Sequence, residues 1–348
     1  MKYVHVTRGA LMASAAMGLL VTGFAARADA TPAPTKTDSS SSVVQDGTGL
    51  ASAGQIAGFI ANHLAGSTGG TGTQTSAAPM TGVAAGGGAA AVGTLWFNAG
   101  AMRVDDSHAG ANYDGDIYNA VLGYDLALTD SLTLGLAGGY ERIRIDTKYN
   151  SGTLKGNVWT IAPYLSYRID DMLSFNATVG RSWADYDVAH SVSATGSTDG
   201  KRWFGAANLV AEQNVDAWRL SETLGYFYVS ETQDAYTESG VGALTVAESK
   251  RHLGQIRVGG KAGYEIPTSF GHVTPYLSAR AEFDVNKSSD VVLTSGATVS
   301  QDDFGTTFGA GVDGAAGRNV NFRVEATTEA FRKDYDAYGI SATVSLKF

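Results

Sequence analysis

The sequence predicts an all-β protein: a transmembrane antiparallel up-and-down β-barrel of about 12 strands, with a flexible N-terminal segment that contains one short helix. Two observations predict this fold. Apolar and polar residues alternate with period two from residue 93 to Phe348, and the links between the alternating stretches are short and long in turn. A third excludes membrane helices, because no later stretch has the ~18 consecutive apolar residues that such a helix needs.

The composition narrows the class of protein further. Only 17% of the 348 residues are charged, whereas soluble domains have about a quarter. The 44 Gly and 16 Tyr beside only 6 Pro suit many short strands and tight turns. No Cys is present, which excludes disulfides, thiol nucleophiles and Cys-ligated zinc. The formal net charge of −9 argues against a nucleic-acid partner, and no motif indicates a cofactor.

Residues 1–30 have the features of a secretory signal peptide. Lys2 and Arg8 precede an uncharged apolar run, and two small-x-small sites predict cleavage after Ala28 or Ala30. The alternative is an uncleaved membrane anchor, for which the apolar run is slightly short. We therefore expect export to the periplasm.

Residues 31–92 form a low-complexity linker or short passenger, rich in Ser, Thr, Gly and Ala. Such a composition buries too little apolar surface to fold alone. One helix is predicted near 54–65, with Ser52 and Gln55 as a capping box and Gly66 as its end. Its apolar stripe would dock into the barrel lumen or at its periplasmic mouth, or alternatively lie on the membrane surface, and it consists of Ile56, Phe59, Ile60 and Leu64.

Residues 93–348 form the predicted barrel. At the C-terminus, apolar residues occupy every second position from Tyr338 to Phe348, so one face would meet lipid and the other the lumen. Short turns are expected near residues 129–131, 170–171, 216–217, 268–271 and 317–319. Longer loops are expected at residues 104–114, 146–156, 187–201, 230–250, 287–301 and 332–336. This asymmetry is typical of barrels with periplasmic turns and extracellular loops, and it places both ends of the barrel in the periplasm.

The same alternation assigns a set of charged side chains to the lumen: Arg257, Lys261, Glu265, Arg280, Glu282, Arg323 and Glu325. These charges would either line a hydrated lumen that holds a helix or admits ions, or form a structural ladder of ion pairs. Near the strand ends, Trp96, Trp159, Trp203 and Trp218 suit an aromatic girdle. Glu222 falls on the apolar face of its strand, which leaves the register there uncertain or indicates a bulge.

One cluster in the first long loop could carry hydrolytic chemistry, because a carboxylate can orient a His that activates water. It comprises Asp105, Asp106, His108, Asp114 and Asp116. Acidic loops are more often solvated surface, so we predict no enzyme activity.

The barrel region resembles the translocator domain of type V autotransporters, over about three quarters of the chain. The matching stretches are residues 124–126, 134–140, 156–167, 273–277 and 339–348. The resemblance implies that an N-terminal passenger crosses the outer membrane with the barrel and that a helix then fills the lumen. It also implies that Val344, Leu346 and Phe348 form the signal read by the outer-membrane assembly machinery. Residues 31–92 are too few for the usual β-helical passenger, and Asn62 is followed by His63 rather than a second Asn.

The sequence therefore predicts an autotransporter-type barrel of a Gram-negative outer membrane with a vestigial or very short passenger. The alternatives are a small structural barrel or narrow pore without a secretion role, and a rim-active hydrolase. The expected partners are outer-membrane lipid, the assembly machinery and periplasmic chaperones. We expect a monomer.

Overall fold

The computed structural model describes residues 38–45, 47, 50–68, 93–190, 194–293, 296, 298–299 and 302–348. All of them belong to one compact unit, Pro32–Phe348. The predicted signal peptide and most of the predicted linker lie outside the described residues.

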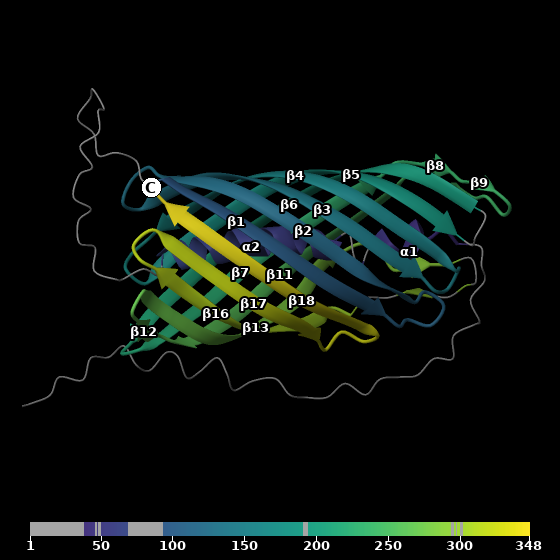
Figure 1. Cartoon of the computed structure of the whole chain (residues 1–348). Helices are drawn as coiled ribbons and strands as arrows, with labels where there is room; N and C mark the ends of the chain where they lie inside the picture. The colour runs from purple at the N-terminus through teal and green to yellow at the C-terminus, as the bar shows by residue number, and fades with distance from the viewer. Residues whose placement is uncertain are drawn as a thin grey trace, which may run out of the picture. The chain divides into compact units, whose positions relative to one another are not determined.

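Twelve long strands form a closed antiparallel barrel, as the alternation predicts (Figure 1). They are β1 (Gly93–Asp106), β2 (Tyr113–Ala127), β3 (Leu132–Thr147), β4 (Gly152–Arg168), β5 (Leu173–His190), β6 (Ala194–Val215), β7 (Trp218–Gln233), β11 (Ser249–Tyr264), β13 (Gly271–Lys287), β16 (Phe304–Ala316), β17 (Val320–Ala330) and β18 (Tyr335–Lys347). Each pairs with its neighbour in the sequence, and β1 pairs with β18 to close the sheet. Closure gives every strand two partners, so no edge is exposed to lipid.

Six short strands lie in the connections: β8 (Tyr236–Thr237), β9 (Ser239–Gly240), β10 (Thr245–Val246), β12 (Ile266–Thr268), β14 (Val291–Val292) and β15 (Thr298–Val299). The barrel has a turn end, where residues 128–131, 169–172, 216–217, 265–270 and 317–319 connect strands and where Gly93 and Phe348 lie. The opposite, loop end carries the connecting residues 107–112, 148–151, 234–248, 288–293, 302–303 and 331–334, and the adjoining ends of β5 and β6, His190 and Ala194, pair there.

The predicted lengths of two loops are wrong. Residues 146–156 and the described part of 187–201 are mostly strand, because β3 continues to Thr147, β4 begins at Gly152, and His190 at the end of β5 pairs with Ala194 at the start of β6. Polar outward residues in these stretches suggested loops. They alternate with buried residues such as Leu154 and Val188, so the sheet simply continues past the apolar band.

The two faces of the sheet follow the predicted alternation. On β18, Ile340 and Val344 are exposed on the outer face, whereas Ser345 on the inner face is buried. No bulge occurs at Glu222, because β7 pairs in unbroken register with both β6 and β11. The Glu222 side chain points outward. A register shift occurs instead between β11 and β13, at Gly254/Gln255. Trp96 is not part of a girdle: it points inward and is 1% exposed.

Two helices precede the barrel in the chain. α1 (Ser41–Val44) lies at the loop end, and α2 (Leu50–Thr68) lies inside the barrel, where it packs against β4 to β7 (Figure 1). α2 is longer than the predicted 54–65, so Ser52 is not a cap and Gly66 does not end it. Packing against the wall supports turns that local sequence signals would end. Among the described residues, no helix has the length and apolarity to cross a membrane.

The assignment of faces predicts opposite effects for two adjacent residues. Ile340→Lys places a charge on the apolar outer face and should cost about 2–4 kcal/mol of folding free energy in a bilayer. Ser341→Lys, on the lumen face opposite Glu325, should be tolerated. A refolding titration in lipid vesicles measures both. A larger loss for Ser341→Lys would contradict this register.

Candidate functional site

The lumen is the candidate functional site, and the apolar stripe of α2 occupies one side of it. Ile56, Ile60 and Leu64 are at most 1% exposed, and Phe59 packs against the same cluster less completely. Their hosts are inward side chains of the wall: Trp96, Val121, Ala137, Ala162, Tyr164, Phe204, Phe227 and Val229. The stripe therefore has an apolar host on one side of an otherwise polar lumen.

A buried charge cluster fastens α2 near the loop end. Arg202 on β6 donates from Nη1 to Ser52 Oγ of α2 at 2.7 Å and from Nε to Glu231 Oε2 at 2.7 Å. Glu141 Oε2 lies 3.5 Å from Arg202 Nη1, and all three charged side chains are fully buried. Tyr186 donates to Glu231 at 3.0 Å. Arg202 thus holds two carboxylates and the helix together.

A second polar cluster fastens the other end of α2 near the turn end. His63 Nε2 lies 2.9 Å from Asp125 Oδ1 on β2, and its Nδ1 lies 3.4 Å from Ser345 Oγ on β18. The imidazole stacks on Trp96 at 4.6 Å between centroids, and the indole donates to Tyr164 at 2.7 Å. These contacts bind the helix to strands on both sides of the β1 seam.

Between these clusters, α2 makes further contacts with the wall. Asn119 donates to Gln55 Oε1 at 2.9 Å, and Arg323 Nη1 donates to the carbonyl of Asn62 at 2.8 Å. The helix is therefore held along its length, and it runs from the loop end at Ser52 to the turn end at His63.

The segment Asp38–Gln45 fills the mouth of the barrel at the loop end. Ser40 donates to the carbonyl of Ala189 at 2.7 Å, and Ser41 shares a hydrogen bond of 2.8 Å with Tyr236. Tyr149 donates to the carbonyl of Ser39 at 2.7 Å, and burial raises the pKa of its hydroxyl well above the usual value, so the donor stays protonated. Val43 and Val44 are buried in an apolar cluster with the ends of the long strands.

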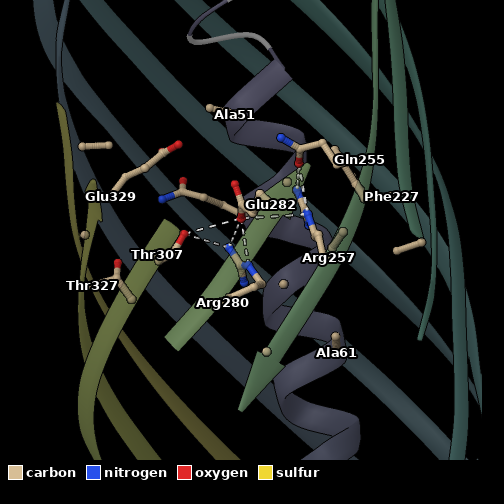
Figure 2. A pocket seen from close by; sticks show the side chains of 18 of the residues that line it. Ala51, Ala61, Phe227, Gln255, Arg257, Arg280, Glu282, Thr307, Thr327 and Glu329 are labelled. Atoms are coloured by element: carbon tan, nitrogen blue, oxygen red, sulfur yellow. Dashed lines mark hydrogen bonds and ion pairs between the residues drawn. The ribbon is translucent and has the colours of Figure 1, made fainter. Parts of the chain in front are cut away.

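On its other side α2 presents mainly small residues, together with Gln55, Phe59 and Asn62, to a cavity of about 340 Å³ that the charged wall also lines. The small residues are Ala51, Gly54, Gly58, Ala61 and Ala65. Figure 2 shows Arg257, Arg280 and Glu282 across the cavity from Ala51 and Ala61. The helix thus occupies one side of the lumen, and on the other side a cavity lined by charged residues remains.

The predicted lumen charges all lie on the inner face, mostly in ion pairs. Arg280 contacts Glu282 at 2.7 Å, Lys261 contacts Asp313 at 3.0 Å, and Arg219 contacts Glu265 at 2.9 Å. Arg323 is bound to Asp313, and Glu325 accepts from Asn62 of α2 at 3.4 Å. Arg257 donates to Gln255 at 2.7 Å, lies over the Phe227 ring at 4.1 Å and is 4.0 Å from Glu282.

The predicted assembly signal lies on the outer face at the turn end. Val344, Leu346 and Phe348 are all exposed there. The Phe348 ring stacks on Tyr124 at 6.0 Å between centroids, and its backbone N–H donates to the Gly93 carbonyl at 3.0 Å. The last residue therefore borders the seam at which the barrel closes.

The acidic residues of the first loop do not form one cluster, because they lie on opposite faces of the sheet. Asp106 is buried and holds His108 Nδ1 at 2.8 Å, whereas Asp114 and Asp116 face outward and bind Arg103. Within the described residues, no group of three or more acidic and His side chains is arranged to hold a metal ion.

Sequence reasoning missed Arg202, Glu141 and Glu231, which form the buried cluster that binds Ser52 of the plug. Alternation on β3 could not single out Glu141, because apolar residues such as Leu136 and Ile143 occur on both faces. It also missed Asp125, whose partner His63 is distant in sequence.

The closed barrel, its occupied lumen and its apolar outer face define the class of outer-membrane β-barrels whose own N-terminal helix fills the pore. The family model described as the autotransporter beta-domain matches residues 95–327, which is more than half of the chain, and the protein belongs to that family. This confirms the predicted resemblance and the location in the outer membrane.

Solved structures agree with this fold. The translocator domain of the autotransporter NalP from Neisseria meningitidis superposes with a TM-score of 0.68 at 16% identity, covering 88% of this chain and 99% of that one. The β domain of the Bordetella autotransporter BrkA gives 0.60 at 16% identity, covering 74% and 100%. At 16% identity, these similarities establish a shared fold and nothing about function.

The chain also aligns with curated relatives, but only over part of their length. Esterase EstA of Pseudomonas aeruginosa is 24% identical over 191 residues, which is 52% of this chain and 29% of that protein, and the EstA of Pseudomonas putida gives the same values. The chain therefore corresponds to less than a third of these relatives.

Proposed function

We propose that the barrel carries the N-terminal part of its own chain across the outer membrane and then keeps α2 as a plug. One observation carries this proposal: the chain lies at the loop end at Asp38–Gln45, follows the lumen as α2, and starts the barrel at the turn end with Gly93. A chain arranged in this way has its N-terminal side at one mouth and its first strand at the other.

We also propose the orientation and the processing. Residues 1–30 act as a cleaved signal peptide, the loop end faces the exterior, and both ends of the barrel are periplasmic. The passenger is then the part of the chain before α2, with Asp38–Gln45 retained in the mouth. The many hydrogen bonds to Ser39, Ser40 and Ser41 support retention rather than release.

A tag inserted at Thr35 tests the translocation. It should be accessible to antibody on intact cells, as a tag at Val241 in a loop-end connection should be, whereas a tag at Arg318 in a turn should not. If the Thr35 tag behaves like the Arg318 tag, the N-terminal side has not crossed the membrane and the proposal fails.

We propose no catalytic role for the barrel itself. The acidic and His side chains of the first loop point to different faces, so they do not converge on one water molecule. A narrow pore is the second candidate function, and the cavity beside α2 favours it.

The proposed partners include the assembly machinery, which would read the last strand, and periplasmic chaperones upstream of it. Phe348→Ser should therefore lower the amount of inserted barrel while export to the periplasm continues. Phe331→Ser, which removes an exposed Phe at the loop end, is the matched control. Heat-modifiable migration of membrane fractions measures both, and equal insertion of the two variants would contradict the role of Phe348.

A further inference from the structure

Arg181 interrupts the apolar outer face of β5. The neighbouring outward residues on its own strand, Val179 and Trp183, are exposed, as are its cross-strand neighbours Ile161 and Trp203. This face meets lipid in an outer-membrane barrel, so the guanidinium is placed among apolar and aromatic side chains that face the membrane.

The guanidinium is positioned by two indoles. Arg181 Cζ lies 4.7 Å from the centroid of the Trp203 ring and 5.7 Å from that of Trp183. Among the described residues, no carboxylate lies within ion-pair distance of Arg181. The nearby Asp234 forms an ion pair of 2.9 Å with Lys201, which is opposite Trp183. Asp185 is the next outward residue of β5 after Trp183. The cation–π contacts orient the charge but do not neutralise it.

Arg103 shows what an outward Arg does when the protein supplies the counter-charge. It faces out from β1 and binds both Asp114 at 2.8 Å and Asp116 at 3.3 Å. Arg181 has no such pair, so its counter-ion must come from the surroundings. The surroundings of this face are lipid, and the anionic group that membrane lipids present at the interface is phosphate.

We propose that Arg181, Trp183 and Trp203 form a binding site for a membrane lipid with an anionic phosphate headgroup. The forked N–H groups of the guanidinium suit the oxygens of a phosphate, and tryptophan rings are stable at the level of lipid headgroups. The acyl chains would lie along Ile161 and Val179. Assignment of the lipid to the outer leaflet rests on the orientation proposed above, but the binding itself does not.

Native mass spectrometry tests the site with the full-length protein in micelles that contain equimolar dioleoyl phosphatidic acid and dioleoyl phosphatidylcholine. We expect about fivefold enrichment of phosphatidic acid on the protein, the size expected for one basic residue near a membrane surface. Arg181→Gln should abolish the enrichment and Arg103→Gln should leave it unchanged. Inorganic phosphate added at the concentration of the lipid should not displace it.

Three results would overturn the proposal: no enrichment on the wild type, equal enrichment on Arg181→Gln, or an Arg181-dependent dimer in place of bound lipid. Arg181→Lys keeps the positive charge, so it serves as a second variant in case Arg181→Gln fails to fold. Because Lys lacks the planar fork, it should lower the enrichment, and an unchanged value would contradict recognition by the guanidinium. None of these outcomes depends on whether the N-terminal segment is translocated.

Discussion

Deletion of residues 50–66 should raise the single-channel conductance of the purified barrel several-fold. The deletion removes nearly all of α2, which covers one side of the lumen and leaves only the cavity of about 340 Å³ beside it. A barrel of about twelve strands without a plug has room for a water-filled channel, since it lies between the filled eight-stranded barrels and the open sixteen-stranded porins. Recording in planar bilayers measures the change.

A deletion of equal length within residues 69–92, which leaves α2 intact, is the matched control and should leave the conductance at the wild-type level. Equal conductance of the wild type and the variant without residues 50–66 would show that α2 does not obstruct the pore. The narrow-pore function predicts a small but measurable current through the wild type, along the charged side of the cavity.

Arg202→Ala should destabilise the barrel by about 3–5 kcal/mol. The guanidinium is the cation between Glu141 and Glu231, all three groups are fully buried, and its removal leaves two buried carboxylates without a cation. It also removes the donor to Ser52 of the plug. Urea titration of refolding into vesicles measures the loss.

Arg103→Ala is the control for that measurement, because its ion pairs are on the exposed outer face and such pairs contribute little. A loss for Arg202→Ala no greater than that for Arg103→Ala would mean that the buried cluster does not hold the plug. Glu231→Gln should have a smaller effect than Arg202→Ala, since the amide can still accept from Arg202 and the charge balance with Glu141 improves.

The sequence predicts the barrel well because one physical rule governs each strand: the outward side chain meets lipid and the inward one does not. The rule places Ile340 and Arg280 on their faces without any knowledge of neighbouring strands. It fails where the sheet leaves the apolar band. There water surrounds both the strand and a loop, so outward polar residues such as Lys155 and Asp187 do not distinguish them.

The contents of the lumen were harder to predict. The apolar stripe of α2 indicates a partner, but the partner face is divided among β1 to β4, β6 and β7, and each of these strands adds one or two buried residues such as Val121 or Phe204. The inward curvature of the wall brings Arg202 on β6 next to Glu141 on β3, although β4 and β5 lie between these two strands in the sheet. The predicted place of Trp96 in an aromatic girdle is wrong for a similar reason. Its ring points inward and stacks on His63 of α2, a contact that the sequence of β1 does not reveal.

Hydrogen exchange of the folded full-length protein in detergent tests most directly whether the chain occupies its own barrel. We predict that the amides from Ala53 to Leu64 exchange as slowly as those in the middle of β5 and β6, because the helix is buried and held by Arg202, Asn119 and Asp125. Exchange of these amides at the rate of an unstructured peptide, while the strands stay protected, would contradict the account.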